Sequence, residues 1–158
     1  MIVVVMGVSG VGKTTIGKLL AGRLGFRFID ADDHHPPANV AKMAAGIALE
    51  DEDRWPWLDA LNRVLRNESD AVIACSALKE AYRRRLLAGI EDARIVYLHG
   101  SMALIAARLE ARKHRYMPAS LLASQFATLE PPAQAIRVDV AADPQACVSA
   151  IVSLLDDR

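Results

Sequence analysis

Short, almost uniformly apolar runs alternate along the chain with longer segments in which apolar residues recur every three or four positions. The short runs are bounded by turn or charged residues and predict five β-strands, at residues 2–6, 26–29, 71–75, 93–99 and 135–140. The longer segments predict helices at residues 13–24, 37–45, 56–67, 79–88, 101–111, 119–128 and 144–156. Because strands and helices alternate and the strands are almost continuously apolar, the pattern indicates an α/β fold with a five-stranded parallel sheet and helices on both faces.

Glycine and proline support these boundaries. Gly25 and Gly89 stand where helices should end, Pro56 falls in an expected first turn, and Pro144 opens the last helix. The sequence shows no repeat, low-complexity tract or linker, so residues 1–158 are expected to form a single domain. The least regular segment is ARKHRYMP, at 111–118, which is basic and separates two helices. We expect it to belong to a small lid at about residues 108–120.

Composition and charge narrow the class of protein. Hydrophobic residues make up 53% of the chain, which is enough for one buried core, and 19 Lys and Arg residues balance 19 Asp and Glu residues. This balance gives no overall field that would favour nucleic acid or an anionic membrane. The start MIVVVMG lacks the features of a signal peptide, and Cys75 and Cys147 form no C-x-x-C pair. We therefore expect a cytoplasmic protein with no membrane or nucleic-acid partner, in which Cys75 is simply a buried small residue.

The stretch GVSGVGKTT, from Gly7 to Thr15, carries the clearest chemistry. It matches G-x-x-x-x-G-K-[ST] between a predicted strand and a predicted helix, which is the context that this phosphate-binding loop requires. Backbone N–H groups and the helix N-terminus would bind phosphate oxygens, and a lysine would bridge the terminal phosphates. Since no N-K-x-D motif for reading guanine is present, we expect ATP with Mg²⁺, bound by Gly7, Ser9, Gly10, Gly12, Lys13, Thr14 and Thr15, with the Thr14 hydroxyl on the metal.

Acidic residues follow the second predicted strand, where open α/β sheets bind their ligands. Phosphoryl transfer to an alcohol needs one carboxylate to orient and deprotonate the hydroxyl, and acidic groups to hold the hydrated Mg²⁺. Asp30 and Asp32 can divide these tasks, because residues two apart on an extended segment face the same side. His35 could contact the substrate. The alternative is that DADD is only a polar turn with a helix cap.

Three cations are expected around the same pocket. Lys79 and Arg83 follow the third strand on one helix face, and Arg54 lies beside two tryptophans at a helix entrance. Three fixed cations favour an anionic acceptor over a neutral sugar, although each could instead be a solvated surface charge. Asp53 could simply cap the helix that contains Pro56.

A second basic cluster lies around the expected lid. Arg108, Arg112, Lys113 and Arg115 could neutralise the transferring phosphates when the lid folds over them, or could be ordinary helix-surface charges. His34, His99 and His114 show no metal-ligand spacing, so no zinc site is expected.

Four blocks together carry a resemblance to a known family. GVSGVGKTT, DADDHHPPANVAKMAAGIALEDEDRWPWL, ACSALKEAYRRRL and YMPASLLASQFATLE, which span about residues 3 to 131 in the same order, resemble the thermoresistant-type gluconate kinases. These enzymes transfer the ATP γ-phosphate to the 6-hydroxyl of D-gluconate and share the fold of the nucleoside monophosphate and shikimate kinases. The shared motifs include H-P-x-x-N-x-x-K-M, D-R-x-P-W-L and C-S-A-L-K.

The resemblance implies specific roles. Asp32 would activate the acceptor hydroxyl, Asp30 would support Mg²⁺ through water, and Arg108 and Arg112 would reach phosphate. It implies gluconate contacts around Asp32, His35, Arg54, Lys79, Arg83 and Gln125, and relatives of this type are commonly homodimers. The chain departs from the family pattern at Ala31, His34, Ala48, Arg84 and Arg115, and no role is assigned to Arg115. The competing hypotheses are a shikimate kinase, a nucleoside monophosphate kinase and a nucleotide-binding module without catalysis.

Overall fold

The computed structural model describes residues 1–111 and 119–156. Five strands form one wholly parallel sheet in the order β2-β3-β1-β4-β5. The strands are β1 (Ile2–Met6), β2 (Arg27–Asp30), β3 (Ala71–Ala74), β4 (Ala93–His99) and β5 (Ile136–Asp139). The helices are α1 (Lys13–Leu24), α2 (Pro37–Ala44), α3 (Asp51–Arg66), α4 (Glu80–Leu86), α5 (Met102–Glu110), α6 (Ala119–Thr128) and α7 (Pro144–Asp156), with a 3₁₀ turn, η1, at Ala31–His34.

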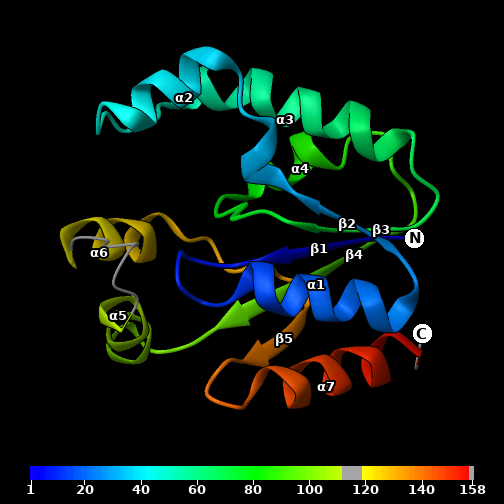
Figure 1. Ribbon diagram of the computed structural model, residues 1–158. Coiled ribbons are helices and arrows are strands. Elements are labelled where there is room, and N and C mark those ends of the chain that lie inside the picture. The colour runs from blue at the N-terminus through cyan, green and yellow to red at the C-terminus, as the bar shows by residue number, and fades with distance from the viewer. Residues whose placement is uncertain (112–118, 157–158) are drawn as a thin grey trace.

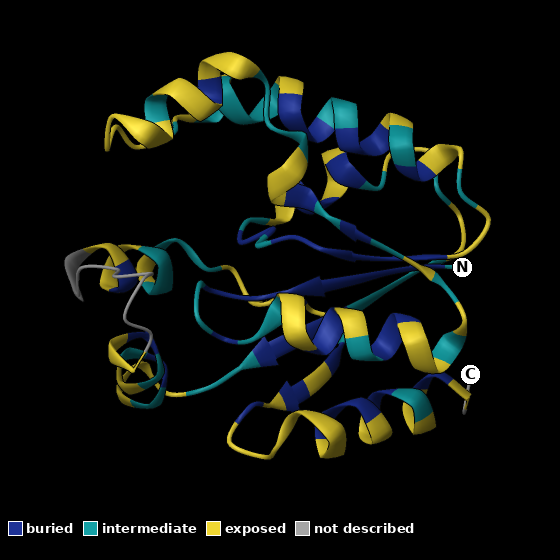
Figure 2. Cartoon of the chain, viewed as in Figure 1, coloured by how far each residue is buried: buried dark blue, intermediate teal, exposed yellow. Residues whose placement is uncertain are grey.

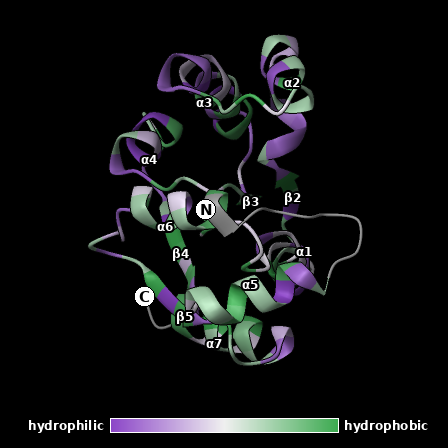
Figure 3. Ribbon diagram, turned by 90° about the vertical axis from the view of Figure 1, so that its left-hand side faces the viewer, coloured by the Kyte–Doolittle hydropathy of each residue, from purple (hydrophilic) through white to green (hydrophobic). Residues whose placement is uncertain are grey.

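The helices cover both faces of the sheet, as the apolar pattern predicted. Helices α3 and α4 lie on one face and α1 and α7 on the other, while α2, α5 and α6 stand near the carboxyl ends of the strands (Figure 1). Figure 3 views the molecule from that edge, with α2 and α3 on one side and α5 and α7 on the other. The predicted α/β architecture is confirmed, and the carboxyl edge of the sheet is where a site can form.

Alternation along β1 divides the core into two halves. Val3 and Val5 face α1 and α7, where they pack against residues such as Leu20 and Ile151. Ile2, Val4 and Met6 face the other side and pack against Leu58, Leu61 and Leu65 of α3. The central strands β1 and β3 are accordingly buried along their whole length and dark blue in Figure 2. Burial on both faces holds the strand ends, and therefore the loops that follow them, in fixed positions.

Two local expectations were wrong. Helix α3 begins at Asp51 rather than at 56, because the Glu50 side chain and the Asp53 side chain form a reciprocal capping box and Pro56 is accommodated inside the helix. The segment after Asp30 is not extended, since it forms the turn η1, which Asp30 caps by accepting a hydrogen bond from the Asp32 amide (3.0 Å). Within the described residues, no helix is long and apolar enough to cross a membrane.

Candidate functional site

The phosphate-binding loop lies between β1 and α1, at the centre of the sheet's carboxyl edge. Two of its glycines are required by geometry. Gly12, the residue before α1, has φ 101°, which disfavours any other residue, and a Cβ on Gly7 would lie 2.7 Å from the Leu98 carbonyl oxygen. The loop therefore curls tightly against β4 and leads directly into the N-terminus of α1, which is the arrangement that binds phosphate.

Lys13 folds back over this loop. Its Nζ donates to the carbonyl oxygens of Gly7 and Val8, both at 3.0 Å. Burial lowers the pKa of the Lys13 ammonium, while the negative charges of Asp32 and Asp30 raise it. The ammonium is thus held between the loop and the acidic residues that follow β2, where it can bridge a donor and an acceptor.

A cavity of about 220 Å³ joins the phosphate-binding loop to the acidic residues. Asp30 and Asp32 both line it, although they are presented by a strand end and a turn rather than by an extended segment. The Asp32 side chain is 86% exposed, so its carboxylate is free to meet a ligand. Residues from other segments complete the wall: Ser9, Lys13, Thr14, His35, Met43, Leu49, Arg54, Trp57, Ala74, Cys75, Ser76 and Gln125.

His35 is fixed within this wall. Its ring stacks on Trp57 with centroids 4.2 Å apart, and the Trp57 indole N–H donates to the Ala31 carbonyl at 2.8 Å. The His35 Nε2 lies 3.9 Å from the Asp32 Oδ1. Burial, with a further contribution from Arg54, lowers the pKa of His35, against the opposing effect of Asp32. A buried imidazole therefore stands beside the exposed carboxylate.

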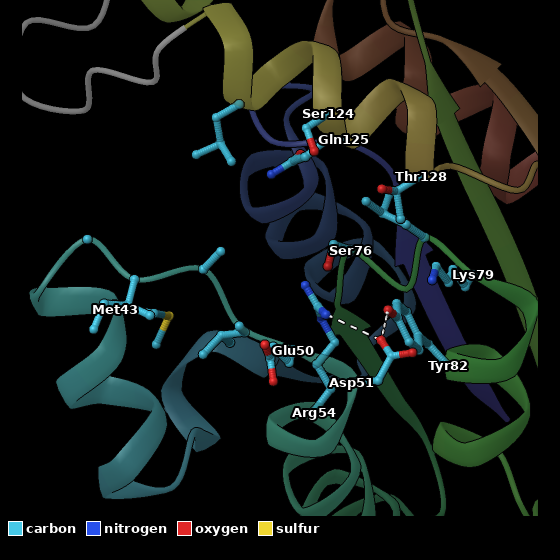
Figure 4. Close-up of a pocket in the computed structure, with 16 residues that line it drawn as sticks. Met43, Glu50, Asp51, Arg54, Ser76, Lys79, Tyr82, Ser124, Gln125 and Thr128 are labelled. Atoms are coloured by element: carbon cyan, nitrogen blue, oxygen red, sulfur yellow. Dashed lines mark hydrogen bonds and ion pairs between the residues drawn. The ribbon is translucent and has the colours of Figure 1, made fainter.

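Arg54 connects this cavity to a larger one, of about 580 Å³, that opens between α3 and α6 (Figure 4). Its Nη1 lies 3.5 Å from Asp51 Oδ1, and its guanidinium lies 5.3 Å from the centre of the Tyr82 ring. The Tyr82 hydroxyl donates to the same Asp51 oxygen at 2.5 Å. This bond, together with Lys79 and Arg54, lowers the pKa of Asp51, and burial and Asp51 raise the pKa of Tyr82 to about 12.

Lys79 lines the larger cavity beside Arg54, with its Nζ 5.7 Å from the centre of the Tyr82 ring. Two of the three expected cations therefore meet at one wall. Asp51 and Tyr82 were not anticipated as site residues, because Asp51 stands in a run of four acidic residues and the spacing does not show which of them faces the cleft.

Arg83 has a different position from the one predicted. Its side chain is only 3% exposed, and the guanidinium donates to the carbonyls of Ala77 (2.8 Å), Leu78 (3.2 Å) and Glu130 (2.8 Å). Ala77 has φ 45°, a left-handed conformation that is unusual for alanine. Arg83 therefore holds the loop between β3 and α4 in shape, and its charge does not stand free in the cavity as the sequence had suggested.

Gln125 of α6 binds the phosphate-binding loop. Its Oε1 accepts from the Ser9 backbone N–H at 2.8 Å, and its Nε2 donates to the Ser9 hydroxyl at 3.1 Å. Gln125 lines both cavities, so it lies where the donor and acceptor sides meet.

A third cavity, of about 280 Å³, lies on the opposite side of the loop. Its wall includes Gly10, Gly12, Thr15 and Arg108, together with Val140 and Ala142 from the loop between β5 and α7 and Pro144 at the start of α7. Arg108 donates to the Val140 carbonyl. Arg112, Lys113, His114 and Arg115, and with them most of the expected lid, lie outside the described residues.

Two other residues considered in the sequence, Asp53 and Cys75, have structural roles. Asp53 completes the cap of α3 and binds Lys42 with both carboxylate oxygens, at 3.0 and 2.8 Å, so the capping alternative is confirmed for it. Cys75 is buried, as expected, and burial raises its pKa to about 12, so the thiol stays protonated.

Among the described residues, no three His, Cys, Asp or Glu side chains are grouped to hold a metal alone. Thr14 and Asp30 both line the cavity of about 220 Å³, where they could hold a Mg²⁺ ion together with nucleotide phosphates and water.

Comparisons with known proteins agree with this geometry. A family model described as shikimate kinase matches residues 9–129. A probable gluconokinase from Xenopus tropicalis is 44% identical, with 100% of this chain and 95% of the relative covered. The crystal structure of a gluconokinase from Sinorhizobium meliloti 1021 is 40% identical with a TM-score of 0.88, covering 98% of this chain and 93% of the other.

A crystal structure of shikimate kinase from Bacteroides thetaiotaomicron, at 16% identity and a TM-score of 0.70 over 99% of this chain and 98% of the other, shares the fold alone. The order of the strands, the loop around Lys13 and the long matches to gluconokinases lead to one assignment. The chain belongs to the gluconokinase family of P-loop kinases.

Proposed function

We propose that the protein transfers the γ-phosphate of ATP to the 6-hydroxyl of D-gluconate, giving 6-phospho-D-gluconate and ADP. The observation that carries this proposal is the small cavity in which Lys13, Asp32 and Arg54 meet. It combines a phosphate-bridging cation, an exposed carboxylate and a carboxylate-binding arginine. The gluconokinases named above, which match nearly the whole chain, support the same reaction.

The donor side is built from the phosphate-binding loop. Its N–H groups and Lys13 would hold the β- and γ-phosphates, and Thr14 with water near Asp30 would hold Mg²⁺, whose charge would stabilise the phosphates. The cavity that contains Arg108 and Val140 would take the nucleoside. Gln125, which is bonded to Ser9, would keep the loop in its binding shape.

The acceptor side is built around Asp32. Its carboxylate would accept the proton of the 6-hydroxyl as that oxygen attacks the γ-phosphorus, and the bond from phosphorus to the β,γ-bridging oxygen would break. The carboxylate at the other end of the sugar acid would lie toward Arg54 and Lys79, because Arg54 lines both cavities and its planar guanidinium suits a carboxylate. His35 would contact the hydroxyls nearest Asp32.

Further parts of the proposal concern the whole molecule. Residues 1–158 would act as a single kinase domain, in which a lid at about 108–120 brings Arg108 and Arg112 to the phosphates. The protein would work in the cytoplasm as a homodimer, with no nucleic-acid or membrane partner. The balanced charge and the absence of a spanning helix in the described residues are compatible with this setting.

The product tests the proposed reaction. The protein is incubated with ATP, Mg²⁺ and D-gluconate, and the mixture is followed by ³¹P NMR. A new phosphate ester coupled to two protons is expected, because C6 is a primary carbon. An ester coupled to one proton would place the phosphate on a secondary hydroxyl, and ADP formation that does not depend on gluconate would contradict the acceptor.

A further inference from the structure

Two of the motifs, H-P-x-x-N-x-x-K-M and D-R-x-P-W-L, meet at a buried amide that the proposed reaction does not use. The first contains His35, Asn39 and Lys42, and the second contains Asp53 and Trp57. Asn39 is a polar residue with only 3% of its surface exposed, and it lies between the first turn of α3 and the His35 ring. Its hydrogen bonds determine what His35 can do.

The orientation of the Asn39 amide follows from its partners. The Nδ2 group lies 2.9 Å from the Asp53 backbone carbonyl oxygen, which can only accept a hydrogen bond. The group at this position must therefore be the NH₂ and not the amide oxygen. The same Nδ2 lies 3.2 Å from the His35 Nδ1. Its second hydrogen points there, so Nδ1 is the acceptor in this contact.

A neutral imidazole carries one N–H, and here it must lie on the other ring nitrogen. We propose that Asn39 is a positioning residue that holds His35 as the Nε2–H tautomer and so presents a hydrogen-bond donor to the acceptor cavity beside Asp32. The His35 Nε2 atom lies 3.9 Å from Asp32 Oδ1, and stacking on Trp57 restricts rotation of the ring. The inference rests on the proposed function for the identity of the acceptor, but the tautomer itself does not.

This arrangement separates the roles of the two neighbouring groups. His35 cannot accept the substrate proton, because Nε2 already carries hydrogen and Nδ1 is occupied by Asn39. If Nδ1 were protonated, its N–H would face the N–H of the Asn39 amide, and two donors cannot form a hydrogen bond. Asn39 therefore also disfavours the imidazolium form of His35. The charged groups that act on the ring are Asp32 from η1 and Arg54 from α3. Asp32 is left as the base, with His35 donating to a substrate oxygen.

The ring protons can be observed directly. Long-range ¹H–¹⁵N correlation spectra of the ¹⁵N-labelled protein distinguish protonated from unprotonated ring nitrogens, and the chain has four histidines, so His35 is assigned by its loss in His35→Gln. The expected result at neutral pH is a protonated Nε2 and an unprotonated Nδ1. A protonated Nδ1 in the wild-type protein would overturn the inference.

Asn39→Leu keeps a side chain of similar size and removes the amide. The His35 ring should then no longer be held as the Nε2–H tautomer, and kcat/KM for gluconate should fall by about tenfold, the effect of losing one hydrogen bond. The control is Lys42→Met, which removes the other link from α2 to Asp53 without contacting the ring. It should leave the tautomer unchanged and kcat/KM within about twofold of wild type.

Two outcomes would refute the positioning role. One is an unchanged ring spectrum in Asn39→Leu, and the other is an equal loss of kcat/KM in Lys42→Met, which would make Asn39 merely a tether for α2. Since the spectrum needs no substrate, a protein with the expected tautomer that fails to phosphorylate gluconate would refute the proposed function alone.

Discussion

Replacing Arg83 tests whether its guanidinium stabilises the fold or binds the substrate. Arg83→Met keeps much of the buried aliphatic chain but removes the guanidinium, which donates to the carbonyls of Ala77, Leu78 and Glu130. At about 1 kcal/mol net for each hydrogen bond, the loss amounts to roughly 3 kcal/mol. The ion pair with Glu80 adds little, because the Glu80 side chain is 49% exposed. For a domain of this size, the melting temperature should fall by roughly 6–12 °C.

The assay compares Arg83→Met with Lys79→Met by calorimetry and by steady-state kinetics at 25 °C. Lys79→Met should leave the melting temperature almost unchanged, since surface substitutions usually change stability by less than about 0.5 kcal/mol. It should raise the KM for gluconate, because Lys79 lines the cleft. If Arg83→Met kept its melting temperature while raising the KM for gluconate as much as Lys79→Met, Arg83 would be a substrate ligand and the structural reasoning would be wrong.

Three further predictions concern the site itself. Asp32→Asn should bind ATP normally and lower kcat by about 10²–10⁴-fold, the usual effect of removing a general base, and an active variant would refute that role. Arg54→Ala should raise the KM for gluconate with little change in the KM for ATP. A change in the KM for ATP alone would show that Arg54 does not bind the gluconate carboxylate. The pKa of His35 is lower in the folded protein than in the unfolded chain. As the pH falls through the ordinary histidine range, His35 is therefore protonated in the unfolded chain but stays neutral in the folded protein, so the free energy of unfolding should decrease over that range. Urea unfolding should show a smaller decrease for His35→Gln, and an equal decrease would show that other groups dominate.

The sequence was most informative where structure depends on local pattern. The strands were predictable because both faces of the sheet are covered, which makes runs such as Ile2–Met6 apolar at every position. The phosphate-binding loop was predictable because its backbone geometry requires glycine at fixed spacing. The start of α3 was missed because Pro56 suggested a first turn, whereas the pairing of Glu50 with Asp53 sets the boundary.

Contacts between distant segments could not be predicted in the same way. Arg83 was expected in the pocket because of its helix face, but the carbonyl of Glu130, 47 positions later, is one of its partners. Likewise, the bond from Tyr82 to Asp51 spans 31 positions and has no local signature. Asn39 stood in a motif whose role became clear only when α2 was seen against α3. Sequence pattern named most of the charged residues of the cleft, whereas the fold determines which of them are free to bind.

A comparison of acceptors tests the central claim most directly. The purified protein is given ATP and Mg²⁺ with D-gluconate, shikimate, nucleoside monophosphates or neutral sugars, and kcat/KM is measured for each from ADP formation. The cleft that joins Lys13 and Asp32 to Arg54 and Lys79 predicts that gluconate is preferred over every other acceptor, with neutral sugars the poorest. A higher kcat/KM for shikimate or a nucleoside monophosphate, or ADP formation at the same rate without any acceptor, would contradict the account.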